Sequence, residues 1–170
     1  MRPQDIVILL KKVTLAGRDM TNAQVAKDLG ISASEVSEAL ERCRIARLVD
    51  NTKQRVNILA LKEFLIHGLK YVFPVQPQSR VRGIATSISA SPLSDMILSD
   101  KEAYVWPYAK GNMRGESIAP LYRTVPMAVQ NDSMLHSLLA ITDTFRIGRA
   151  REVEIAKEEL NSILATYDVK

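Results

Sequence analysis

Apolar residues recur at helical spacing along the first 50 residues and divide them into three predicted helices. The first covers residues 4–16, the second covers residues 21–29, and the third runs from about residue 33 to residue 46. Thr21 and Asn22 are both suitable N-caps for the second helix, and Gly30 is the residue type that most often ends one. Ser32 and Glu35 form a capping-box pattern that predicts the start of the third helix.

After the third helix the pattern changes from helical to strand-like. Two short apolar pieces, residues 48–49 and 56–58, flank a polar turn over residues 50–55 that contains Lys53 and Arg55. This arrangement predicts a small basic hairpin. Helical spacing returns over residues 59–70.

Regular spacing is lost over residues 71–126, which hold all but one of the prolines. We expect short strands, turns and one helix near 93–98 here, packed on the rest of the chain. Two amphipathic helices are then predicted over 132–147 and 150–165. The expected fold is mainly α with one small β-hairpin. It is divided into a domain over 1–70 and an interaction region over 71–170, in which 71–126 are mixed and 127–167 helical.

Residues 21–48 carry the packing pattern of a helix-turn-helix. Ala26 is small enough for a close helix crossing, Gly30 can adopt a left-handed backbone, and Ile31 can close the corner. Val36 and Leu40 then point inward from the following helix. The pattern V-A-x-x-L-G-I-S-x-x-x-V-S-x-A-L, with a helix before it and a hairpin after it, resembles winged helix-turn-helix bacterial transcriptional regulators of the broad MarR-like type over about residues 5–70.

The resemblance implies a sequence-specific regulator of double-stranded DNA, with the helix after the turn in the major groove and the wing on the neighbouring backbone. The positions that it assigns to base or groove contacts are Ser32, Ser34, Ser37, Glu38 and Arg42. The implied wing contacts are Lys53, Gln54 and Arg55, and Thr21, Asn22 and Lys27 are the implied phosphate contacts. Regulators of this type repress as homodimers, with two recognition helices about 34 Å apart. The apolar faces of 132–147 and 150–165 are expected to form the dimer contact, to pack on their own domain, or both.

Three glutamates, Glu35, Glu38 and Glu41, make the predicted recognition helix acidic. Phosphates repel carboxylates, although the capping box can occupy Glu35 and a cytosine amine can donate to Glu38. Two alternatives therefore stay open. The winged helix can serve protein contacts only, or residues 71–170 can bind a protein partner, as an antitoxin binds its toxin, with the winged helix left for autoregulation.

A second group of residues interleaves aromatic rings with cations. It comprises Arg80, Arg82, Tyr104, Trp106, Tyr108, Lys110 and Arg114. Such residues can stack on single-stranded bases, bind a nucleotide, or form the pocket of a ligand-responsive regulator. Alternatively, the aromatic side chains pack the fold while the cations face water.

Composition narrows the remaining function classes. The net charge is +4, and the positive excess lies in residues 1–125, which is compatible with a polyanionic partner. The single cysteine, Cys43, allows no internal disulfide and no multi-cysteine metal site, and neither His67 nor His136 has metal-ligand spacing around it. No serine lies in a nucleophile-elbow pattern. We therefore expect no enzyme, metal or cofactor. The lack of a signal peptide or a membrane-length apolar run predicts a cytoplasmic protein with no membrane partner.

Overall fold

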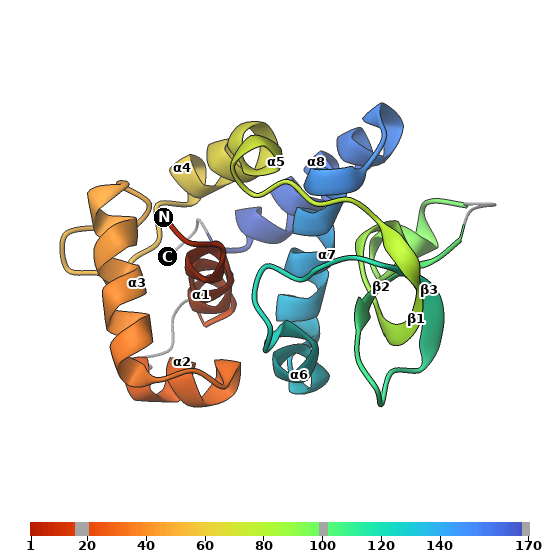
Figure 1. Ribbon diagram of the computed structural model, residues 1–170. Coiled ribbons are helices and arrows are strands. Elements are labelled where there is room, and N and C mark those ends of the chain that lie inside the picture. Colours follow the sequence, from red (N-terminus) through yellow and green to blue (C-terminus); the bar gives the residue numbers. More distant parts are fainter. Residues whose placement is uncertain (16–20, 99–101, 168–170) are drawn as a thin grey trace.

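The computed structural model describes residues 1–15, 21–98 and 102–167 and is mainly helical, as the sequence predicts (Figure 1). Its small sheet has three strands and lies after residue 77, outside the predicted hairpin. The helices are α1 (Pro3–Thr14), α2 (Asn22–Leu29), α3 (Ala33–Ile45), α4 (Ile58–Glu63), α5 (Leu69–Val72), α6 (Val125–Ala128), α7 (Ser133–Ile147) and α8 (Ala150–Ala165). The strands are β1 (Gln78–Ala85), β2 (Tyr104–Pro107) and β3 (Met113–Ser117). The predicted end of the first helix at residue 16 lies outside the described residues.

The first three helices follow the local signals in the sequence. Thr21 caps α2 by accepting a hydrogen bond from Gln24 N at 3.3 Å, and Gly30 ends it in the left-handed conformation with φ 65°. The predicted hairpin after α3 is reduced to a single antiparallel bridge between Val49 and Val56, because Ile58 already begins α4. From Ile58 the helix continues through a π-helical turn over Phe64–Gly68 into α5.

The three strands close into a small barrel. β1 pairs antiparallel with both β2 and β3, and β2 pairs parallel with β3. Two glycines permit this closeness, because a Cβ atom at Gly83 would meet the carbonyl of Trp106 and one at Gly115 would meet the carbonyl of Ala103. The predicted helix near 93–98 is a single 3₁₀ turn over Leu93–Asp95.

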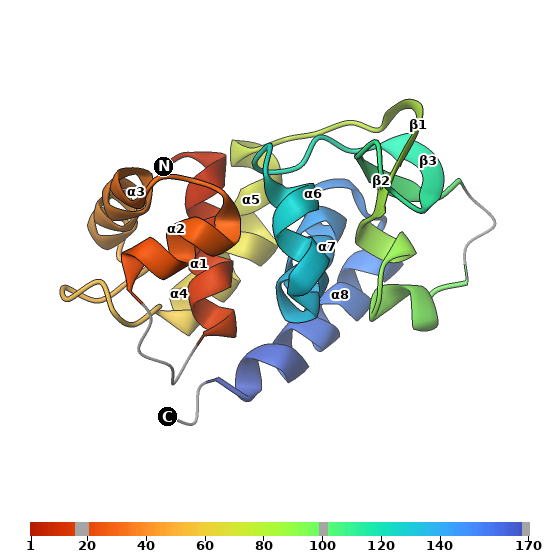
Figure 2. The same cartoon turned by 90° about the horizontal axis from the view of Figure 1, so that it is seen from below.

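Helix α7 lies at the centre of the molecule, and α1 and α8 both pack against it (Figures 1 and 2). Its buried side chains belong to one hydrophobic core that also includes α1, α3 and α8. Lys11 of α1 strengthens this junction, since its Nζ lies 3.0 Å from a carboxylate oxygen of Asp28 and 2.8 Å from one of Asp132, the N-cap of α7. Residues before and after position 70 therefore share a core.

A buried polar cluster joins the barrel to α7. The Asp143 carboxylate accepts hydrogen bonds from Thr86 Oγ1 at 2.8 Å, Trp106 Nε1 at 2.6 Å and Arg146 Nη1 at 2.8 Å. Arg146 also donates to the carbonyl of Phe73 at 2.9 Å, which fixes the chain after α5. The cluster thus connects the barrel, α7 and the segment between α5 and β1.

The apolar faces expected to form a dimer contact are covered by this chain itself. Leu135, Leu138 and Phe145 of α7 are at most 3 % exposed, and Leu160 and Leu164 of α8 at most 2 %. Of the two readings of these helices, the structure thus shows packing on their own chain.

Candidate nucleic-acid interface

The turn between α2 and α3 sets the position of the candidate recognition helix. Ile31 N donates to the carbonyl of Ala26 at 3.0 Å across the left-handed Gly30, which closes α2. Ser32 then starts α3: its Oγ accepts from Glu35 N at 3.2 Å, and its N donates to Glu35 Oε2 at 2.9 Å. The predicted capping box is therefore confirmed.

One side of α3 is buried, and much of the opposite side is exposed, with Glu41 half-buried in its middle. Val36, Ala39, Leu40 and Cys43 are at most 1 % exposed and face the core. The positions half a turn away are exposed and comprise Ser34, Ser37, Glu38 and Ile45, of which Ile45 is 70 % exposed. Hydroxyl groups and one carboxylate are thus available to a partner on this surface, which we call the open face of α3.

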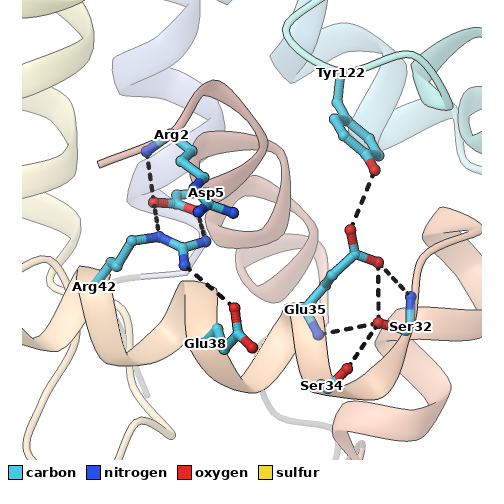
Figure 3. A network of polar contacts seen from close by, with 8 residues as sticks. All are labelled: Arg2, Asp5, Ser32, Ser34, Glu35, Glu38, Arg42 and Tyr122. Atoms are coloured by element: carbon cyan, nitrogen blue, oxygen red, sulfur yellow. Dashed lines mark hydrogen bonds and ion pairs between the residues drawn. The ribbon is translucent and has the colours of Figure 1, made fainter.

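Each glutamate of α3 has a basic or hydrogen-bonding partner in the molecule, and Figure 3 shows those of Glu35 and Glu38. Glu35 accepts from Ser32 and from Tyr122 Oη at 3.4 Å, and its pKa is lowered, chiefly by its hydrogen bonds with Ser32. Glu41 contacts Arg44 Nη2 at 2.7 Å and Lys53 Nζ at 2.6 Å, and these hydrogen bonds lower its pKa to about 2. Among the described residues, the one basic partner of Glu38 is Arg42, whose Nη1 lies 3.9 Å from its carboxylate. Glu38 is therefore the least compensated carboxylate on the open face.

Arg42 is held by α1 rather than presented to solvent (Figure 3). Its Nε and Nη2 donate to the two carboxylate oxygens of Asp5 at 2.9 and 2.7 Å, and the Asp5 side chain is fully buried. The Arg42 side chain is 23 % exposed, and the hydrogen bond to Asp5 raises its pKa. The predicted base contact by Arg42 would require breaking this pair, so the structure gives Arg42 a packing role in the free protein.

The hairpin over 50–55 lies beside the open face of α3. Asp50 organises its turn by accepting from Thr52 Oγ1, Gln54 N and Arg55 N at 2.5, 2.9 and 3.1 Å. The ion pair between Lys53 and Glu41 fixes the hairpin to α3, while Gln54 and Arg55 remain exposed. Of the predicted wing contacts, these last two are thus open to a ligand.

The predicted phosphate contacts Thr21, Asn22 and Lys27 are exposed on α2 and its N-cap. Sequence reasoning missed two residues that influence the interface, Asp5 and Tyr122. Tyr122 lies 87 positions after Glu35 along the chain, and no local pattern connects them. Arg123, next to it, is exposed and its charge also lowers the pKa of Glu35.

The second predicted group divides into buried and exposed members. Trp106 is 1 % exposed and donates to Asp143, so its ring packs the fold, which is the second of the two alternatives for this group. Tyr104 and Tyr108 are half-buried. The cations Arg80, Arg82, Lys110 and Arg114 are all exposed, and Arg80 Nε lies 3.0 Å from Glu102.

Other kinds of site find little support in the part of the chain that the structure describes. It contains no group of three or more His, Cys, Asp or Glu side chains able to hold a metal ion. Within the same residues, no helix combines the length and apolar character needed to cross a bilayer.

Comparison with known proteins does not add a family to this geometry. No family model, curated protein or solved structure matches the chain. The functional interpretation therefore rests on the geometry described above.

Proposed function

We propose that this protein binds double-stranded DNA through the open face of α3 and acts as a transcriptional repressor of the winged helix-turn-helix type. The observation that carries the proposal is an N-capped helix, buried along one side only, whose other side exposes Ser34, Ser37, Glu38 and Ile45 beside a hairpin with the exposed side chains of Gln54 and Arg55. An exposed helix of this kind fits the major groove of B-form DNA.

Each exposed group has a defined role in this proposal. The hydroxyls of Ser34 and Ser37 contact bases or phosphates near the start of α3. Arg55 and Gln54 contact the backbone from the hairpin, and Lys27 does so from α2. Because one short helix reads few base pairs, we propose a homodimer on a palindromic site, joined through a surface other than the buried face of α7.

Selection of bound sequences from a random duplex library tests the proposal directly. We expect a short palindromic motif and binding that weakens with salt. Ser37→Glu should lower duplex affinity at least about tenfold because it adds a charge that phosphates repel, and Arg55→Gln should reduce the salt slope by about 1. Ser162→Glu, an equal charge change at an exposed position of α8, is the matched control and should bind normally. Absence of salt-sensitive binding to any duplex at low salt would reject the proposal.

A protein-binding role for the same face is the second candidate. Its supporting observation is Ile45, 70 % exposed on a surface that also carries the weakly compensated Glu38. This combination is more typical of a protein contact than of a groove contact. Co-purification with the product of a neighbouring gene, lost in Ile45→Asp and kept in Ser162→Glu, would favour this candidate over DNA binding.

A further inference from the structure

The outer face of the barrel brings two arginines directly opposite each other. Arg82 of β1 and Arg114 of β3 are register partners in the antiparallel pair, and both are exposed. Directly opposite residues on one face have Cβ atoms about 4.5–5.5 Å apart. The structure therefore holds two guanidinium groups on adjacent strands within reach of one common ligand.

The next register pair along the same face joins opposite charges, whereas the Arg82–Arg114 pair joins like charges. Arg80 faces Glu116 across the strands, and its Nε lies 3.0 Å from Glu102. Among the described residues, by contrast, no carboxylate lies within ion-pair distance of Arg82 or Arg114. Arg80 therefore has acidic neighbours, whereas Arg82 and Arg114 on the same two strands have none at ion-pair distance among the described residues.

A turn that carries a third cation adjoins the pair. Lys110 lies in a turn whose Gly111 approaches the backbone of Gly83, the neighbour of Arg82. The N–H of Tyr108, a half-buried residue, donates to the carbonyl of Arg82 at 3.1 Å. Like charges directly opposite each other destabilise a sheet, and a bound anion would remove this repulsion.

We propose that Arg82 and Arg114, assisted by Lys110, bind the phosphate backbone of a single-stranded nucleic acid. Guanidinium groups fit phosphate oxygens bidentately, and a positively charged surface that follows the backbone is typical of proteins that bind unpaired strands. The site lies at the end of the molecule opposite α3, with α1 and α7 between them (Figures 1 and 2). It is therefore a second site, and it does not depend on the proposed binding of duplex DNA by α3.

Fluorescence anisotropy with a labelled 20-nucleotide single strand tests the proposal on the full chain. We expect binding to wild type at low salt and a loss of at least about tenfold in Arg82→Gln/Arg114→Gln, with the salt slope reduced by about 1.4 for two lost phosphate contacts. Arg80→Gln, on the same strand and face but compensated by Glu102, is the matched control and should bind normally. The background variant Ser37→Glu, which disables α3, should leave single-strand binding unchanged.

Thermal unfolding distinguishes an anion-binding arginine pair from one that only stabilises the fold. Without ligand, the double variant should melt at the same temperature as wild type or higher, because the repulsion is removed. The oligonucleotide should raise the melting temperature of wild type and not that of the double variant.

Several results would overturn the inference. These are equal single-strand binding by the double variant and Arg80→Gln, destabilisation of the ligand-free double variant, and no single-strand binding by wild type at low salt. Stabilisation by inorganic phosphate with no oligonucleotide binding would assign the pair to small phosphates instead. Equal affinity for polyglutamate would assign it to acidic protein segments.

Discussion

The ion pair between Asp5 and Arg42 determines which side chains the candidate interface exposes to a partner. The resemblance assigns Arg42 to base contacts, yet both of its hydrogen bonds to Asp5 are short and the carboxylate is fully buried. A buried carboxylate without its partner is strongly unfavourable. The pair therefore orders α1 against α3. The open face is left with the hydroxyls of Ser34 and Ser37, the Glu38 carboxylate and Ile45, next to Gln54 and Arg55 of the hairpin.

Replacement of Arg42 by Met should destabilise the fold by about 3 kcal/mol, because the Asp5 carboxylate would remain buried without its counter-charge. Asp5→Asn/Arg42→Met should recover part of this loss. Arg44→Met is the control, since its partner Glu41 is 40 % exposed, and it should change stability little. Urea unfolding followed by circular dichroism measures all three, and equal destabilisation by Arg42→Met and Arg44→Met would disprove the role of the pair.

Cys43 should be inert in the folded protein. Its side chain is fully buried, and burial raises the pKa of the thiol to about 12, so only about one molecule in ten thousand carries the reactive thiolate at pH 8. Labelling with a thiol-specific disulfide reagent should be very slow in the native state and rapid in denaturant. Fast native labelling, at the rate of a free thiol, would instead indicate an accessible redox-active cysteine.

At the scale of elements, the turn between α2 and α3 depends on one backbone conformation. Gly30 has φ 65°, and a Cβ atom there would also contact the side-chain end of Met127. Any change at this position therefore combines backbone strain with crowding by a flexible neighbour.

Gly30→Ala should destabilise the protein by about 1–2 kcal/mol, because alanine is strained in the left-handed region. Gly30→Asn should be milder, since asparagine tolerates this conformation and both variants carry the Cβ atom that contacts Met127. Thermal unfolding of the two variants makes the comparison. If Gly30→Ala and Gly30→Asn lowered the melting temperature equally, strain in the left-handed conformation would not be the reason for glycine at this position.

Elements with local signals were predictable from the sequence, and elements that need distant partners were not. The boundaries of α2 and α3 follow from Thr21, Gly30 and the Ser32–Glu35 capping box, all within a few residues of the helix ends. The barrel depends on pairing between strands and on close backbone approach at Gly83 and Gly115, which no spacing indicates. The same distinction applies to the site: its hydroxyls were foreseen, but not the compensation of Glu35 by the distant Tyr122.

At the scale of the whole molecule, the two parts of the chain stabilise each other. Helix α1 is buried on most of its surface because α3 covers one side and α7 another. Lys11 joins α1, α2 and the start of α7. Burial lowers the pKa of Lys11, but its hydrogen bonds to Asp132 and Asp28 outweigh this and raise it. Residues 1–70 therefore lack part of their core when the rest of the chain is absent.

A fragment that ends at residue 72 should consequently fail to fold, because the α1 side chains that contact α7 would be exposed to water. In the full chain, the fluorescence of the single tryptophan, Trp106, reports on the barrel, while circular dichroism reports mainly on the helices. Since Trp106 donates a hydrogen bond to Asp143 of α7, the fluorescence and the circular dichroism should follow one urea transition with the same midpoint. Separate midpoints, or a cooperatively folded fragment of residues 1–72, would show that the two parts are independent domains.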